Sequence, residues 1–324
     1  MKKNLIIYSP ARIHIGFLDL EKKSTRKFGS LGLTISNFSY KIKMEECNIM
    51  KVICNNKILK EKIINILKFF KTNYLISNLK ITVLSEIPMH HGLGSGTQLA
   101  LSLGYLIIKY FNLNVNINDI SILLSRGLRS GVGIESFKKG GFNIDVGKLQ
   151  NTSDPPLNIL NLKWPKNWKI LLIFDTNLVG VHGNKEIKEF RELEKIKKYT
   201  SNSNFKALVM NVIPGLMEKN FNEFSNGIRI IQDNMSKIFY GSRNKFASNI
   251  IQKIFCNLRN NEIKSFGQSS WGPTGFIFFE DSKKRNQLLN HIENYINLDG
   301  MSGVKLLKVN GRNFGKKIIK KEIL

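Results

Sequence analysis

The spacing of apolar and polar positions predicts a chain that opens with β-strands. Residues 3–8 form a short apolar run, and residues 11–18 alternate between apolar and polar side chains. Alternation with a period of two is typical of a strand that buries one face. Similar runs predict further strands at 39–44, 49–53, 78–85, 141–146, 168–175, 275–280 and 303–309.

The longest helical pattern runs from Gly96 to Phe111. This stretch contains no proline and is apolar almost all round, which favours a largely buried helix. A second helix is expected over 117–128, with Asn116 or Asn118 as its N-cap. The pattern predicts further helices at 60–71, 184–198, 204–219, 221–238, 244–259 and 282–296.

A loop-rich stretch, residues 147–167, separates the two halves of the chain. It contains prolines 155, 156 and 165 and several asparagines, which is the composition of a domain boundary. We therefore expect one domain over 1–165 and a second over 166–324. Because strands and helices do not alternate as regular βαβ units, the predicted fold class is α+β, in two parts.

The chain is strongly basic, with 50 Lys and Arg against 24 Asp and Glu, so its net charge is 50 − 24 = +26. Such a surplus raises the question of nucleic acid. The excess is scattered and mostly lysine, mixed with abundant Asn and Ile, which is typical of an A/T-rich genome. Nucleic acid is therefore not the expected partner, although the charge attracts small anions.

Cysteine content and hydropathy indicate a cytoplasmic protein. The three cysteines, Cys47, Cys54 and Cys256, form no CxxC pair, which argues against a disulfide framework or a zinc site. No apolar stretch reaches the roughly 18 residues of a membrane span. We expect no membrane association.

A glycine-rich segment lies between the strand at 78–85 and the long apolar helix. The first turn of a helix has unpaired N–H groups and a partial positive charge, and glycines let an anion approach closely. The segment is neither a Walker A loop nor a GxGxxG fingerprint, and a glycine turn without a ligand is the alternative. The predicted phosphate-binding residues are Gly92, Leu93, Gly94, Ser95, Gly96, Thr97 and Gln98.

This segment resembles the central phosphate motif of the GHMP kinases. PARIHIG at 10–16 resembles their first motif, and GQSSWGPTG at 267–275 lies where their third motif is expected. The resemblance implies the two-domain GHMP-kinase fold. In that fold the N-terminal domain is like one found in a ribosomal protein, and the C-terminal domain is a ferredoxin-like α/β domain.

Longer stretches resemble one branch, the β-ribofuranosylaminobenzene 5′-phosphate synthase family. They are ARIHIGFLDL at 11–20, GSLGLTIS at 29–36, GLGSGTQLAL at 92–101, RGLRSGVGIESFKKGGFNIDVG at 126–147 and GQSSWGPTGF at 267–276. The resemblance implies that phosphoribosyl pyrophosphate is joined to 4-aminobenzoate or 4-hydroxybenzoate in methanopterin biosynthesis, with loss of CO₂ and pyrophosphate. It also implies Mg²⁺ and a homodimer.

Loss of pyrophosphate leaves a cation-like ribose C1, so the site needs cations on the leaving group and a carboxylate near C1. Arg129 and Ser130 join the phosphate-binding candidates, with Arg126 beside them. Asp19, Arg26 and Asp145 are the catalytic candidates, and Ser95 with Asp145 the candidate Mg²⁺ ligands. The alternatives are helix capping for Asp145 and a solvated surface position for Arg26.

The first and third motifs supply the candidates for substrate binding, namely Arg12, His14, Ser269, Ser270, Trp271, Gly272 and Thr274. The indole of Trp271 is suited to stacking on an aromatic ring, and a core position in a tight turn is its alternative. For His14, on an apolar strand, a buried core histidine is the default interpretation.

Two other functions are consistent with parts of the sequence. An ATP-dependent small-molecule kinase of the same fold is the first, since Glu135 falls near where some GHMP kinases carry a catalytic Asp. An RNA-binding protein is the second, and it predicts steeply salt-dependent affinity. That second function leaves the GTQLAL and QSSWGPTG stretches unexplained.

Overall fold

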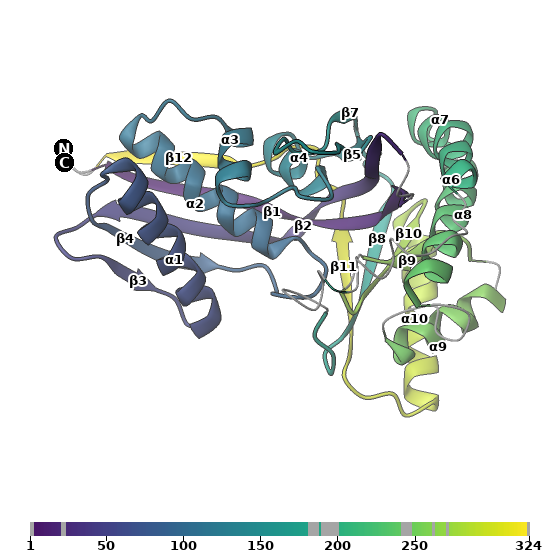
Figure 1. Cartoon of the computed structure of the whole chain (residues 1–324). Coiled ribbons are helices and arrows are strands. Elements are labelled where there is room, and N and C mark those ends of the chain that lie inside the picture. Colours follow the sequence, from purple (N-terminus) through teal and green to yellow (C-terminus); the bar gives the residue numbers. More distant parts are fainter. Residues whose placement is uncertain are drawn as a thin grey trace.

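The computed structural model describes residues 3–20, 24–180, 188, 201–240, 248–260, 263–269 and 272–322. These residues form two sheets with helices packed against them, arranged side by side (Figure 1). The first sheet and helices α1–α4 make the left half of the view, and the second sheet with the later helices makes the right half.

The first sheet has eight strands and is built around two long ones, β1 and β2. Its path is β12-β1-β2-β4-β3, with β5 and β6 also pairing β2 and with β7 pairing β5. The strands are β1 (Lys3–Asp19), β2 (Arg26–Glu46), β3 (Lys51–Ile53), β4 (Leu79–Ser85), β5 (Phe142–Asp145), β6 (Lys148–Leu149), β7 (Asn158–Leu162) and β12 (Lys317–Glu322).

Strand β1 is continuous, whereas the sequence predicts two strands, 3–8 and 11–18. Its register against β2 shifts between Pro10 and Arg12 and again between His14 and Gly16. A bulge accommodates a proline because the extra residue need not donate to the ladder. The shifts re-aim the side chains at 12–17, where the first predicted motif lies.

Four helices accompany the first sheet, α1 (Lys57–Tyr74), α2 (Ser95–Phe111), α3 (Ile117–Leu123) and α4 (Val132–Lys138). The α2 helix is largely buried, as its composition predicts. The α3 helix stops five residues short of the predicted end at 128. Ser125 and Gly127, with φ of 52° and 74°, have a left-handed backbone that a helix cannot contain.

The second sheet is antiparallel, in the order β11-β8-β10-β9. It comprises β8 (Lys169–Asp175), β9 (Phe266–Gln268), β10 (Thr274–Phe279) and β11 (Val304–Asn310). Helices α9 (Asn249–Asn260) and α10 (Ser282–Leu298) pack on one face through Leu171 and Ile173 of β8. The alternate residues Ile170 and Leu172 join the main core instead.

The main core contains residues from both halves of the chain. Helices α6 (Ser201–Ala207), α7 (Ile213–Met217) and α8 (Phe221–Tyr240) contribute to it, with a π-helical turn over Leu208–Val212 where one helix, 204–219, is expected. The predicted helix 184–198 lies outside the described residues apart from residue 188, and helix α9 begins at Asn249 in the described part of the chain.

The last strand, β12, pairs antiparallel with β1, so the end of the chain returns to the first sheet. Figure 1 shows the two termini together at its left edge. The predicted division after residue 165 stays a prediction. Residues 317–322, which that prediction assigns to the second domain, lie in the first sheet.

Candidate active site

The glycine-rich segment forms a loop whose backbone turns directly into α2. Gly92 and Gly94 have φ of 76° and 79°, a left-handed conformation that favours glycine. Gly94 is the N-cap of α2 and offers no side chain to cap it. Residues 94–97 are partly exposed. The N–H groups of the first helical turn are therefore accessible to an anion, as the sequence predicts.

Arg12 of β1 supports this loop from beneath. Its Nη1 donates to the carbonyl of Gly92 at 2.6 Å, and its backbone N–H donates to the carbonyl of Leu93 at 3.1 Å. A Cβ on Gly94 would stand 3.2 Å from the Arg12 side chain. The guanidinium thus fixes the loop conformation and adds positive charge next to the helix N-terminus.

The third motif packs directly on the same loop. A Cβ on Gly272 would lie 2.3 Å from the Gly92 nitrogen, and a Cβ on Gly92 would lie 2.3 Å from the Ser269 carbonyl oxygen. Each glycine is required because the two backbones touch. Segments about 180 residues apart, predicted separately from the sequence, therefore form one junction.

Ser269 joins three parts of this junction. Its Oγ accepts from the backbone N–H of His14 at 2.9 Å and donates to the Gly92 carbonyl at 2.8 Å. It is fully buried. These bonds assign Ser269 a supporting position under the loop rather than the predicted direct contact with substrate.

Among the other third-motif residues, Gly272 and Thr274 are buried in the same tight turn, where the Ser269 N–H donates to the Thr274 carbonyl at 2.9 Å. Their backbones shape the turn. Ser270 and Trp271 lie outside the described residues, so their predicted substrate contacts stay predictions.

The second glycine-containing stretch, with Gly131 and Gly133, forms the start of helix α4. Gln98, fully buried, ties this helix to the first motif. Its Nε2 donates to the Gly133 carbonyl at 2.7 Å and its Oε1 accepts from Ser9 Oγ at 2.6 Å. Gln98 is therefore a scaffold residue, not the predicted phosphate ligand, and it sets the two helix N-termini side by side.

Asp145 lies at the end of β5, beneath the N-terminus of α4. One carboxylate oxygen accepts from the Gly147 N–H at 3.0 Å, and the other from the Gly131 N–H at 2.9 Å and from Ser30 Oγ. Burial raises the pKa of Asp145 to about 6, and these donors oppose that rise. Because Asp145 is fully buried and its oxygens have donors, the geometry favours the capping role over Mg²⁺ binding.

Ser130 connects this buried group to the partly exposed side of the site. Its Oγ lies 2.6 Å from Ser30 Oγ, which in turn donates to Asp145. Ser130 is itself partly exposed. The predicted phosphate-binding role of Ser130 therefore stays open, whereas Ser30 was not recognised in the sequence as a site residue.

His14 lies on the sheet face that α4 covers. Its partner across the strands is Gly32, and a Cβ on Gly32 would collide with Val132 of α4. His14 is 2% exposed, with neither ring nitrogen bonded to the described residues. Burial, and secondarily the charge of Arg12, lowers the pKa of His14 to about 3. The ring is neutral at physiological pH.

Asp19 and Arg26 flank the hairpin between β1 and β2. Asp19 accepts from Ser24 Oγ at 2.7 Å, and Arg26 Nη1 donates to the Gly147 carbonyl at 3.2 Å. Both side chains are half-buried. Gly147 is also bonded to Asp145, so Arg26 and Asp145 share one turn.

Arg126 lies beside the loop, with Nη1 3.5 Å from where a Cβ of Gly96 would stand. Its charge also contributes, after burial, to the lowered pKa of Lys62. Arg129 is partly exposed in the same segment. One cation, Arg126, therefore adjoins the N-terminus of α2, which suits an anionic ligand.

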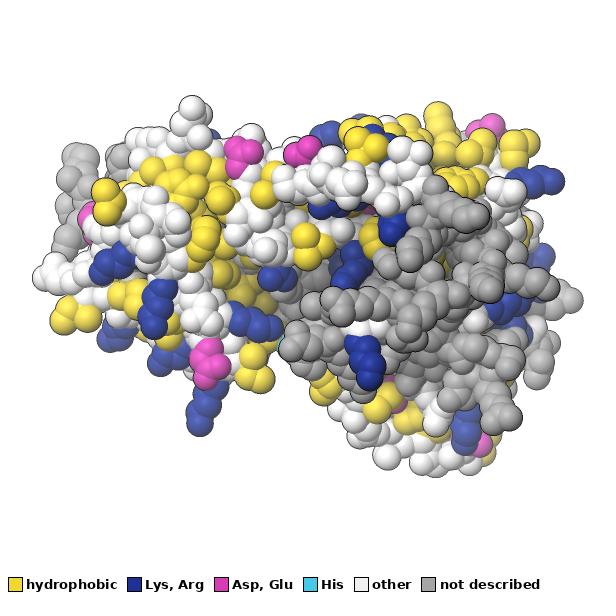
Figure 2. All heavy atoms as spheres, in the orientation of Figure 1, with side chains coloured by type: hydrophobic (Ala, Val, Ile, Leu, Met, Phe, Trp, Pro, Cys, Tyr) yellow, Lys and Arg dark blue, Asp and Glu magenta, His cyan; other side chains and the backbone are white. Residues whose placement is uncertain are grey.

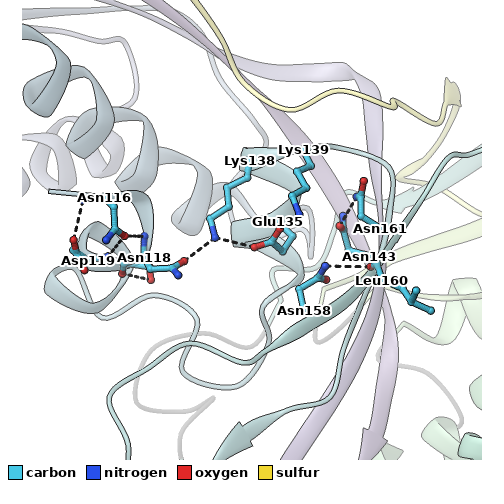
Figure 3. Close-up of polar contacts among 11 residues, drawn as sticks. Asn116, Asn118, Asp119, Glu135, Lys138, Lys139, Asn143, Asn158, Leu160 and Asn161 are labelled. Carbon is cyan, nitrogen blue, oxygen red and sulfur yellow. Dashed lines mark hydrogen bonds and ion pairs between the residues drawn. The ribbon is translucent and has the colours of Figure 1, made fainter.

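Glu135, on which the kinase alternative depends, forms two ion pairs. Its carboxylate lies 2.9 Å from Lys138 Nζ and 3.8 Å from Lys139 Nζ, and Lys138 also donates to Asn118 (Figure 3). In the view, both lysines converge on Glu135 from the same helix. A carboxylate held in this way is a poor general base.

Two residues that position the site have no motif in the sequence. Gln232 of α8 donates to the Ile15 carbonyl and accepts from the Gln268 N–H at 3.0 Å. Ser9, one residue before the first motif, bonds Gln98. An amide on an amphipathic helix and a serine in a strand give no signal that sets them apart from surface residues.

Comparisons with known proteins agree with this geometry. The model of the GHMP kinases N terminal domain matches residues 58–144, which include the loop and α4. A β-ribofuranosylphenol 5′-phosphate synthase of Methanocaldococcus jannaschii is 28% identical, covering 85% of this chain and 89% of the relative. The synthase of the same name from Methanothermobacter thermautotrophicus is 24% identical, covering 98% and 99%.

The chain is similar to these synthases over most of its length, and residues 58–144 match the N-terminal domain of the GHMP kinases. Solved structures of the superfamily show the same fold. Mevalonate diphosphate decarboxylase from Staphylococcus aureus has a TM-score of 0.67 at 13% identity, with 98% of each chain covered. A homoserine kinase from Cytophaga hutchinsonii has a TM-score of 0.64 at 13% identity, covering 98% and 97%. The predicted GHMP-kinase fold is confirmed.

The expected Mg²⁺ and the expected homodimer stay predictions. No cluster of three His, Cys, Asp or Glu side chains suited to a metal occurs in the part of the chain that the structure describes. Over the same residues, no helix is long and apolar enough to cross a membrane.

Proposed function

We propose that the chain transfers a phosphoribosyl group from phosphoribosyl pyrophosphate to 4-hydroxybenzoate or 4-aminobenzoate. The bond from ribose C1 to pyrophosphate breaks, a C–C bond forms to the ring carbon that carries the carboxylate, and CO₂ leaves. The chain is an enzyme of the pentosyltransferase class, as its synthase relatives indicate. The match over nearly the whole chain carries the proposal.

The relatives' name, which specifies a ribofuranosylphenol, favours 4-hydroxybenzoate as the acceptor. The geometry is consistent with the donor. The open first turn of α2, with the hydroxyls of Ser95 and Thr97, suits a diphosphate. Arg126 adjoins that loop, and together with Arg129, which is partly exposed, it would stabilise charge on the leaving pyrophosphate.

Asp19 is the better candidate for the carboxylate near C1, because it is half-exposed whereas Asp145 is sealed beneath α4. Arg26, on the same hairpin, would bind the anionic substrate. The neutral imidazole of His14 is buried and is suited to a structural role rather than to proton transfer.

Mg²⁺ fits this residue set as an ion carried on the diphosphate. Such ions commonly use one or two carboxylates together with substrate phosphates. Ser95 would hold it together with the substrate phosphates, and it would neutralise charge on the departing pyrophosphate. Homodimer formation is proposed from the family resemblance.

The test is a turnover assay on the purified chain with phosphoribosyl pyrophosphate, Mg²⁺ and each acceptor labelled in its carboxyl carbon. We expect labelled CO₂ and a ribosylated arene in equal amounts, with the hydroxybenzoate preferred. Ser95→Ala and Asp19→Asn should each lower kcat at least tenfold, while Lys283→Gln, on exposed α10, should not. Folded protein that releases no CO₂ with either acceptor contradicts the proposal.

ATP provides the second arm of this assay. The kinase alternative predicts that ATP is bound and its terminal phosphate transferred to a small molecule. The ion pairs of Glu135 argue against that reaction. Phosphate transfer from ATP, without CO₂ release, would replace the synthase with the kinase.

A further inference from the structure

A second basic pocket lies in the C-terminal half, apart from the loop and from Asp145. Its volume is about 260 Å³, below the usual size of a pocket for a drug-sized ligand, so it suits a small ion. It opens between α8, α9 and β9. Its main lining residues are Arg229, Gln232, Asp233, Arg259, Lys264 and Phe266.

The charge of this pocket is unbalanced. Among the described residues, three cations line it with one carboxylate, so their net charge is 3 − 1 = +2. Asp233 is shared, since Arg259 contacts one oxygen and Arg229 Nε lies 3.7 Å from the other. Each guanidinium has five N–H donors, which one shared carboxylate cannot satisfy. Lys264 is exposed and has no carboxylate partner among the described residues.

The floor of the pocket is rigid and apolar apart from one amide. Phe266 is 5% exposed and Gln232 is 7% exposed. Arg259 lies over the Phe266 ring, 5.7 Å from its centroid, which holds the guanidinium at the wall. An oxyanion entering here would meet preplaced donors and lose little conformational freedom on binding.

Gln232 connects the pocket to the phosphate loop. Its amide bonds Ile15 in β1 and Gln268 in β9, and a Cβ on Gly267 would stand 2.2 Å from it. Ser269, which follows Gln268, bonds both His14 and Gly92. A shift of the Gln232 side chain would therefore move the two strands on which the loop rests.

We propose that this pocket binds a small phosphate-class anion and that its occupancy changes the affinity of the phosphate loop. The ligand is an inorganic phosphate or diphosphate, or the phosphate group of a small metabolite. Arg229, Arg259 and Lys264 hold its oxygens, while Gln232 senses it from the floor. The site goes beyond the proposed reaction, because none of its residues belongs to the loop or to the two motifs beside it.

The binding test uses calorimetric titration of the full chain with inorganic phosphate. We compare the wild type with Arg229→Gln/Lys264→Gln and with a control of equal charge change, Lys283→Gln/Lys305→Gln, whose residues are exposed elsewhere. The wild type and the control should show a phosphate site that the first double variant loses or binds at least tenfold more weakly. Arg229→Lys/Lys264→Arg should restore it.

This result does not depend on the proposed function. If the loop binds no phosphate, the wild type still shows one phosphate site, in the pocket, and the Arg229→Gln/Lys264→Gln variant shows none. Identical isotherms for the wild type and that variant would overturn the proposal. Glucose 6-phosphate is a second probe that separates the two sources of phosphate. A pocket that takes phosphorylated metabolites binds it, whereas a pocket that takes only the free anion does not.

The coupling test measures pyrophosphate affinity with and without saturating phosphate. If phosphate only competes with pyrophosphate for the loop, it should lower the affinity for pyrophosphate equally in the wild type and in the Arg229→Gln/Lys264→Gln variant. We expect an additional change of at least threefold in the wild type that is absent from the Arg229→Gln/Lys264→Gln variant. Equal changes in the two proteins would refute the coupling.

Discussion

Two glycines in backbone contact hold the candidate active site together at the residue scale. Gly92 and Gly272 come from opposite halves of the chain, and neither leaves space for a side chain. The sequence indicates these two glycines only because each lies in a glycine-rich motif. The contact itself was not predictable, because it depends on how the second sheet docks against the first.

Gly92→Ala should reduce activity at least tenfold and lower stability. A Cβ at φ of 76° costs about 1–2 kcal/mol in backbone strain, and here it also collides with the Ser269 carbonyl. Thermal unfolding and turnover measure the two effects. Gly300→Ala is the control, since Gly300 has a φ of 60° but no atom lies within 4 Å of an added Cβ. This variant should lower the free energy of unfolding by only about 1 kcal/mol and leave activity unchanged.

His14 should make folding stability depend on pH. Its pKa is about 3 in the folded chain against 6.5 ordinarily, so the unfolded chain binds more protons between these values. Its contribution is fully present above pH 6.5 and is lost as pH falls towards 3. The difference between these two pKa values corresponds to about 5 kcal/mol in the free energy of unfolding.

The measurement for His14 is urea unfolding from pH 7 to 4, comparing the wild type with His14→Asn. The variant should lack most of the acid loss. Asp145 acts in the opposite sense, because its raised pKa makes stability fall as pH rises from about 4 to 6, so only the difference between the two proteins isolates His14. Parallel curves would show that His14 titrates normally.

At the scale of elements, the sequence predicts the buried helix α2 and the strands β8 and β10 well, because their apolar runs are long and uninterrupted. It also predicts β11, whose valines and leucines are interrupted by Lys305 and Lys308. It fails for α4 and β12. Two glycines in the α4 region resemble a loop, and tertiary packing overrides that weak propensity. The β12 strand is rich in lysine, which is typical of an edge strand and hides its pattern.

The bridge from α2 to α4 and β1 is the element-scale feature on which the site depends. Gln98→Leu keeps the size of the side chain but removes both hydrogen bonds, leaving Ser9 Oγ and the Gly133 carbonyl without this buried partner. Each loss costs about 1–3 kcal/mol, so we expect the free energy of unfolding from denaturant titration to fall by about 2–6 kcal/mol in total.

The same substitution should weaken substrate binding, because the helix N-termini lose their fixed spacing. Gln287→Leu on exposed α10 serves as the matched control and should change stability by less than about 0.5 kcal/mol. Equal behaviour of the two variants would mean that Gln98 does not set the position of α4.

At the scale of the whole molecule, Figure 2 shows Lys and Arg side chains mixed with apolar and uncharged polar groups on the face that it draws. The expectation that the net charge of +26 attracts small anions rather than nucleic acid stays a prediction.

The last strand of the chain, β12, covers the edge of β1 and should stabilise the first sheet. The β12 strand pairs with β1 through six residues, from Lys3 opposite Glu322 to Tyr8 opposite Lys317, and β1 continues from there into Arg12 and His14. Removing residues 317–324 would leave that edge of β1 unpaired and expose the side chains beneath Ile318. Burial of one aliphatic side chain alone is worth about 1.5–3 kcal/mol, so we expect at least about 2 kcal/mol of destabilisation.

This truncation should also reduce turnover, because the edge of β1 next to the first motif would fray. Lys317→Ala/Lys320→Ala retains the strand and its backbone pairing while removing two exposed charges, so it should unfold like the wild type. If the truncated chain keeps its unfolding midpoint and its turnover, β1 is held by β2 alone, and the position of Arg12 beneath the loop owes nothing to the end of the chain.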